Sequence, residues 1–96
     1  MISSFRGREA ERIWNGEFSR RLPQEIQEVA RRKLRMINNA RVIADLRVPP
    51  ANRLEALKHD RAGQYSIRIN DQWRICFEWP SSSPGPTNIE IVNYHQ

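Results

Sequence analysis

The chain has 96 residues and a formal net charge of +5. Its composition, 39% hydrophobic and 28% charged, is that of a soluble globular protein and excludes a disordered chain, and its length predicts a single domain, 1–96. It contains no apolar stretch long enough for a membrane span and no recognisable secretory leader, and a single cysteine, Cys76, excludes an internal disulfide. These features predict a cytoplasmic protein without a membrane partner.

The positive charge is concentrated in the first half of the chain. Residues 1–49 hold eleven Lys and Arg against six Asp and Glu, whereas residues 50–96 hold five of each. A basic surface favours a polyanionic partner, either nucleic acid or an acidic protein. A helix face that is simply exposed to water would also account for the excess.

The first half predicts helices. "MISSF" is a candidate edge strand, and "REAERIWNG" predicts a short helix ended by Gly16. The clearest helix covers residues 23–38, and Pro23 suits its first position. One apolar stripe runs along it, with spacings of four, four and three: Ile26, Ala30, Leu34 and Ile37. "RVIADLR" predicts another short helix, which Pro49 and Pro50 end.

The second half changes to the two-residue period of strands. Apolar and polar residues alternate in "YSIRI", "WRICFEW" and "NIEIV", and "NRLEAL" is a fourth candidate strand. "NDQ" and "SSSPGPT" separate these runs at distances typical of hairpins. The fold class predicted is therefore α+β, with N-terminal helices packed on one face of a small antiparallel sheet.

Residues able to bind and cut RNA gather around this predicted sheet. Arg68 and Arg74 fall on the face opposite the large apolar residues, where planar cations suit phosphate. Two other segments supply four more groups. Lys58 and Arg61 lie in the loop that leads into the strand of Arg68, and Tyr94 and His95 close the last strand. Because the 2′-hydroxyl of RNA is itself the nucleophile, a base, a cation and an acid suffice to cleave it without a metal.

The same residues also fit plain structural roles. Arg68 and Arg74 could be cross-strand partners of Glu78 or Glu90. Four other residues have similar explanations. Tyr94 could be a ring at the edge of the core, His95 a tail histidine, His59 a surface histidine and Cys76 a buried thiol. No HxxxH or CxxC spacing predicts a metal, and no Gly-rich loop predicts a nucleotide, so no cofactor is expected.

A family resemblance adds to this interpretation. "PPANRLEALKHDRAGQYSIRINDQWRICFEW", together with the later "EIVNYH", closely resembles the HigB-type toxins, or plasmid maintenance system killer proteins, of the RelE/ParE superfamily. "MISSF" and the amphipathic helix fit the same pattern, so the resemblance covers essentially the whole chain. It implies a compact RelE-like α+β toxin of a type II toxin-antitoxin system. It also implies ribosome-dependent cleavage of messenger RNA and neutralisation by a helix-turn-helix, HigA-type antitoxin.

The resemblance also implies catalytic residues. Tyr94 and His95 match the family's Asp-Tyr-His ending, whereas Asn93 stands where the family has the aspartate. Some members carry a catalytic histidine at the position that Glu55 occupies here, and a carboxylate could serve as the base. Arg74, in "QWR", matches the family arginine that stabilises the phosphate.

The RNA-binding residues expected complete the site. Lys58 and Arg61 match basic loop positions of the family, Arg68 lies beside them in the predicted sheet, and three helix arginines are expected to dock ribosomal RNA: Arg31, Arg32 and Arg35. Two alternatives stay open at this point. One is a gyrase-directed toxin of the ParE kind, and the other is a catalytically weak module that acts through antitoxin binding and repression.

Overall fold

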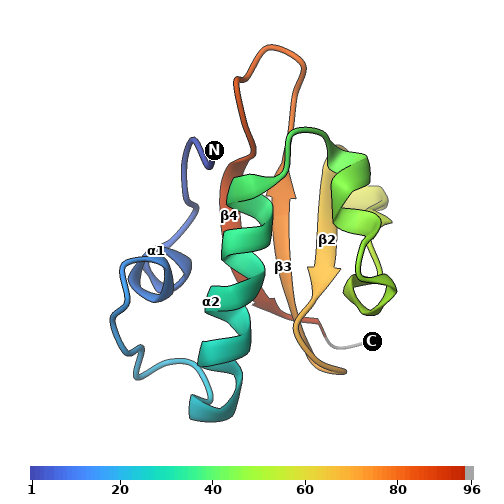
Figure 1. Cartoon of the computed structure of the whole chain (residues 1–96). Coiled ribbons are helices and arrows are strands. Elements are labelled where there is room, and N and C mark those ends of the chain that lie inside the picture. The colour runs from blue at the N-terminus through green and yellow to red at the C-terminus, as the bar shows by residue number, and fades with distance from the viewer. Residues whose placement is uncertain (95–96) are drawn as a thin grey trace.

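Helices and 3-10 turns pack around a four-stranded antiparallel sheet in the computed structural model, which describes residues 1–94 (Figure 1). The elements, in chain order, are α1 (Arg8–Trp14), α2 (Gln24–Asn39), the 3-10 turns η1 (Ile43–Arg47) and η2 (Pro50–Asn52), β1 (Glu55–Ala56), the 3-10 turn η3 (His59–Arg61), β2 (Gln64–Arg68), β3 (Trp73–Glu78) and β4 (Thr87–Asn93). The strands follow one another as β1-β2-β3-β4. The predicted α+β class, with helices on one face, is confirmed.

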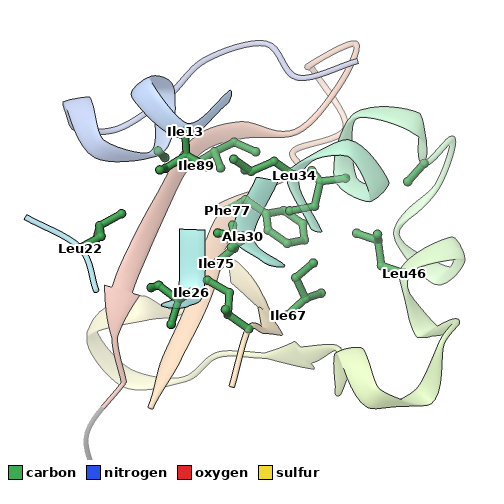
Figure 2. Packing of buried hydrophobic residues seen from close by; sticks show 14 residues of the cluster. Ile13, Leu22, Ile26, Ala30, Leu34, Leu46, Ile67, Ile75, Phe77 and Ile89 are labelled. Carbon is green, nitrogen blue, oxygen red and sulfur yellow. The ribbon is translucent and has the colours of Figure 1, made fainter. Parts of the chain in front are cut away.

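Helix α2 lies across one face of the sheet and buries one side against it (Figure 1). Its predicted stripe is buried, with exposed fractions of 0 to 2%: Ile26, Ala30, Leu34 and Ile37. Ile67, Ile75 and Phe77 meet this stripe from the strands (Figure 2). Pro23 lies just before the helix as its N-cap. No helix among residues 1–94 is long and apolar enough to cross a membrane.

Three elements differ from the sequence-based predictions. "MISSF" forms no strand but a single parallel bridge, Phe5 to Ile89, along the outer edge of β4. "RVIADLR" shortens to the 3-10 turn η1, and "NRLEAL" to the two residues of β1. The last difference arises because Asn52 is buried in η2 and Arg53 adopts a left-handed conformation (φ 47°), which interrupts the extended run.

A buried amide fixes the connection between the two helices. Gln27 accepts a hydrogen bond from the backbone amide of Ser19 (3.0 Å) and donates to the carbonyls of Ser19 (2.7 Å) and Leu22 (3.0 Å). Ser19 is fully buried although it lies in a loop. The loop is therefore held by satisfied hydrogen bonds inside the protein, and it sets the angle at which α1 meets α2.

A second buried polar pair ties α2 to the segment that leads to β1. The Lys33 ammonium donates to Asn52 Oδ1 (2.5 Å), and Asn52 Nδ2 donates to the carbonyls of Leu46 (3.2 Å) and Val48 (3.4 Å). Burial lowers the pKa of Lys33, and the nearby charges of Arg32 and Arg68 lower it further. The hydrogen bonds of Asn52 thus help to position β1 beside β2.

We expect Asn52→Leu to lower the free energy of unfolding by about 2–4 kcal/mol, because it removes three hydrogen bonds and leaves the Lys33 ammonium buried without an acceptor. Urea unfolding followed by circular dichroism measures the change. The matched control is Asn39→Leu at the exposed end of α2, which should stay within about 0.5 kcal/mol of the wild type. Equal losses in the two variants would contradict the role given to Asn52.

Candidate active site

The outer face of the sheet, opposite α2, carries the polar residues of the strands. The register sets Ser66 opposite Cys76 and Cys76 opposite Glu90, and in the next row it sets Arg68 opposite Arg74. The predicted juxtaposition of the two arginines is therefore confirmed. Ser66 and Cys76 are nevertheless fully buried, so something must cover this face of β2 and β3.

The cover is the loop between β1 and β2, anchored by Arg61. Arg61 Nη1 donates to Glu90 Oε1 on β4 (3.0 Å) and to Gln64 Oε1 (2.9 Å). The ion pair spans β2 and β3, and the hydrogen bond with Glu90 raises the pKa of Arg61. The Arg61 cation thus both contributes positive charge and holds the loop against the last strand.

Arg74 lies next to this loop with its guanidinium held from three sides. Nη2 donates to the backbone carbonyl of Arg53 (2.7 Å), Nη1 lies 3.6 Å from Glu55 Oε1, and Cζ lies 5.3 Å from the centroid of the Tyr94 ring. The last contact has the geometry of a cation–π interaction. The Arg74 side chain is only 12% exposed, and its Nε has no hydrogen-bond partner among the described residues.

A pocket of about 280 Å³ opens beside Arg74 and brings together predicted residues from two segments that are far apart in the sequence. β1 and the loop after it supply most of its lining, and the residue that follows β4 closes it: Glu55, Ala56, Leu57, Lys58, His59, Arg61 and Tyr94. The backbone amide of Tyr94 donates to the Gln72 carbonyl (2.6 Å), which fixes the ring at the pocket. The structure therefore brings together Glu55, Lys58, Arg61 and Tyr94, with Arg74 in contact with two of them.

Two residues proposed for the site lie apart from this pocket. The Arg68 guanidinium pairs with Asp71 in the turn between β2 and β3. Asn93 is exposed and registers opposite Trp73, so the alternation of the strand places it on the other face from Tyr94. The alternative pairings of Arg68 and Arg74 with Glu78 or Glu90 are wrong, since Glu90 binds Arg61 and Glu78 accepts from Asn88.

The helix arginines lie on the opposite side of the sheet, on α2. Arg32 and Arg35 are exposed. Arg31 differs from them, because its Nε donates to the carbonyl of Ile13 (2.9 Å) and its Nη2 to that of Glu17 (3.4 Å). Arg31 therefore joins α2 to the C-terminal end of α1, and the three arginines do not form one equivalent set.

The two histidines have opposite outcomes. The predicted catalytic residue His95 lies outside the described residues. His59, which the sequence suggested to be a surface residue, is exposed and lines the pocket. The signal that could have identified it is its place directly after Lys58, in the loop whose cations were predicted to face RNA.

Cys76 lies in β3 on the same face of the sheet as Arg74, and its side chain is fully buried. Burial raises the pKa of its thiol to about 11, so the thiol stays protonated at neutral pH. Within residues 1–94, no three His, Cys, Asp or Glu side chains lie close enough together to hold a metal ion.

Comparisons with known proteins agree on the kind of protein this is. Residues 3–95 match the family model described as "RelE-like toxin of type II toxin-antitoxin system HigB". The chain is 36% identical over 80 residues to Toxin HigB-1 of Vibrio cholerae serotype O1, covering 82% of this chain and 84% of that protein. It is 39% identical over 80 residues to an uncharacterized protein of Haemophilus influenzae, covering 83% and 79% respectively.

The fold has a match among solved structures as well. A YoeB/ParE toxin from Agrobacterium tumefaciens superposes with a TM-score of 0.51 over 99% of this chain and 98% of that one, at 19% identity. At this identity the superposition shows a shared fold. The match over nearly the whole length and the identity to Toxin HigB-1 confirm the resemblance seen in the sequence: the chain belongs to the HigB-like, RelE-like toxins of type II toxin-antitoxin systems.

Proposed function

We propose that this chain is a ribosome-dependent endoribonuclease, an mRNA interferase that stops translation by cutting messenger RNA. The observation that carries the proposal is the environment of Arg74. A guanidinium fixed by the Arg53 carbonyl and the Tyr94 ring stands beside a pocket lined by Lys58 and His59. Such a preorganised cation stabilises the negative charge that grows on phosphorus during cleavage.

The roles follow from the chemistry of RNA cleavage. The 2′-oxygen attacks phosphorus and loses its proton, and the bond from phosphorus to the 5′-oxygen breaks. Glu55 and His95 are the proton-transfer groups of this proposal, and Tyr94 stacks on or orients a base. Asn93 stands where the family has a carboxylate, and its replacement by aspartate should maintain or raise activity.

The contact between Arg74 and Glu55 is present in the protein without bound RNA. Nη1 lies 3.6 Å from a carboxylate that is 51% exposed, so water weakens the pair. A phosphate in the pocket can therefore take over the guanidinium at low cost, and Glu55 is then free to accept a proton. Lys58, exposed at the rim, adds a second positive charge for the RNA backbone.

The partners proposed are the ribosome, its messenger RNA and a HigA-type helix-turn-helix antitoxin, all in the cytoplasm. A toxin of a type II system has an antitoxin partner, and the basic surface of this chain suits an acidic one. Arg32 and Arg35 lie on the face away from the pocket, where they can contact ribosomal RNA while the pocket faces the messenger. Arg61 adds positive charge at the pocket, and Arg68 is a further RNA contact at the turn between β2 and β3.

One experiment tests the function as a whole. The protein is induced in cells, and messenger RNA ends and DNA breaks are mapped in the same culture. We expect new messenger ends on translated transcripts and no DNA breaks. DNA breaks without cut messengers would identify a gyrase-directed toxin, and neither signal would leave a module that acts through antitoxin binding.

Arg74→Ala should reduce the rate of messenger cleavage on ribosomes by about 100-fold or more, because it removes the cation that stabilises the transition state. Single-turnover cleavage measures the loss, with circular dichroism and antitoxin binding as checks of the fold. The control is Arg68→Ala, directly opposite in the register, whose guanidinium is engaged by Asp71. It should weaken RNA binding a few-fold and leave the maximal rate unchanged. Comparable losses of maximal rate in both variants would refute a special role for Arg74.

Replacing Arg32 and Arg35 together by alanine should weaken ribosome binding and lower the slope of log affinity against log salt by roughly two, one per lost phosphate contact. The free energy of unfolding should not change, since both side chains are exposed. Arg31→Ala should instead cost about 1 kcal/mol of stability, because it frees the carbonyls of Ile13 and Glu17. Binding titrations between low and physiological salt decide this, and an unchanged slope in the double variant would exclude the docking role.

A further inference from the structure

The cleavage proposed above needs two proton transfers, one from the 2′-hydroxyl and one to the 5′-oxygen that leaves. Among the residues that line the pocket, His59 has the side chain type that most readily exchanges a proton near neutral pH. It is exposed, so a substrate can reach it. Its neighbours in the pocket include Glu55, Lys58 and the Tyr94 ring.

The backbone of His59 is held in an unusual conformation. Its φ of 57° lies in the left-handed region, which residues other than glycine rarely adopt. The turn is nevertheless closed, because Arg61 N donates to the Lys58 carbonyl (3.1 Å) and Ala62 N to that of His59 (3.0 Å). Glycine would fit this position without strain, so an imidazole here costs stability, and such costs are concentrated at functional sites.

The position of His59 relative to the end of β4 is also fixed. Two residues further along the same turn, Arg61 forms the ion pair with Glu90 of β4. The base of the loop is closed by Leu57 N, which donates to the Gln64 carbonyl (2.8 Å). The turn that carries His59 is therefore anchored on both sides, at the strand pair and at β4, and His59 lines the same pocket as Tyr94.

We propose that His59 is a further catalytic residue, the general acid that protonates the leaving 5′-oxygen. The 2′-oxygen forms its bond to phosphorus and gives its proton to the base, Glu55 or His95. The bond between phosphorus and the 5′-oxygen breaks, and the imidazolium of His59 gives its proton to that oxygen. The products are a 2′,3′-cyclic phosphate and a 5′-hydroxyl, and the base returns its proton through water. This step rests on the proposed function.

Polar and charged groups line the same pocket as His59 or stand next to it in the sequence. The groups from β1, the loop and the chain after β4 are Glu55, Lys58, Asp60, Arg61 and Tyr94.

The test uses ribosomes carrying one of two messengers. One is ordinary, and the other has sulfur in place of the 5′-oxygen at the bond that the wild-type protein cuts. Sulfur leaves as a thiolate and needs no proton, so loss of the acid should not slow this messenger. The variants are His59→Gly and His59→Asn, which both tolerate the left-handed backbone. The comparison variants are Lys58→Gln and His95→Ala.

We expect both His59 variants to cut the ordinary messenger on the order of 100-fold more slowly than the wild type. On the sulfur messenger they should come within a few-fold of it. Lys58→Gln and His95→Ala should be slow on both messengers, because they remove a phosphate contact and a base or its partner. If sulfur restores the cleavage rate of the His59 variants and of no other variant, His59 is the general acid.

Three results would overturn the inference. The His59 variants could cut the ordinary messenger at the wild-type rate, they could be equally slow on both messengers, or His95→Ala could be the variant that sulfur rescues. Each of these leaves the proposed function intact, because the wild type still cuts. If the wild type cuts neither messenger, the proposed function itself fails, and the role of His59 fails with it.

Discussion

The antiparallel register of β2, β3 and β4 decides on which face of the sheet the polar groups of these strands lie. Successive side chains of a strand point to opposite faces, so burying Ile75 and Phe77 under α2 obliges Arg74 and Cys76 to face the other way. The neighbouring strands then place Arg68 and Glu90 beside them. A slip of one residue would move the arginine into the core and an isoleucine out of it, so the register is strongly specified.

Much of the fold and part of the site could be predicted from the sequence. The helical stripe from Ile26 to Ile37 and the alternation in β2 to β4 are local periodicities of the sequence. The folded protein has the helix and the strands that these periodicities predict. The short elements were harder to predict from the sequence. Whether residues 52–57 extend depended on Asn52, whose buried contacts to Lys33 and Leu46 belong to other segments. Local propensity cannot reveal a partner that is 19 residues away.

The arginines show the same limit more sharply. Arg31 and Arg32 are neighbours in the sequence and cannot be told apart there. The rotation of the helix directs Arg31 toward the end of α1 and leaves Arg32 exposed to water. Arg61 was predicted as a cation for RNA, and its pairing with Glu90 gives it a second task, which is to hold the loop. His59 could not be distinguished from a surface residue until the fold placed its turn next to Tyr94. Pockets assembled from distant segments are a property of the tertiary structure.

The burial of the single cysteine has a consequence for reactivity. The single cysteine, Cys76, lies beneath the ion pair of Arg61 and Glu90, and burial keeps its sulfur protonated. Alkylating reagents attack the thiolate and need a path to it, and the closed loop denies them both. Labelling of Cys76 would therefore occur only during transient lifting of the loop. The chain thus carries a built-in chemical reporter, because the rate at which this thiol is modified measures how often the loop between β1 and β2 lifts from the sheet.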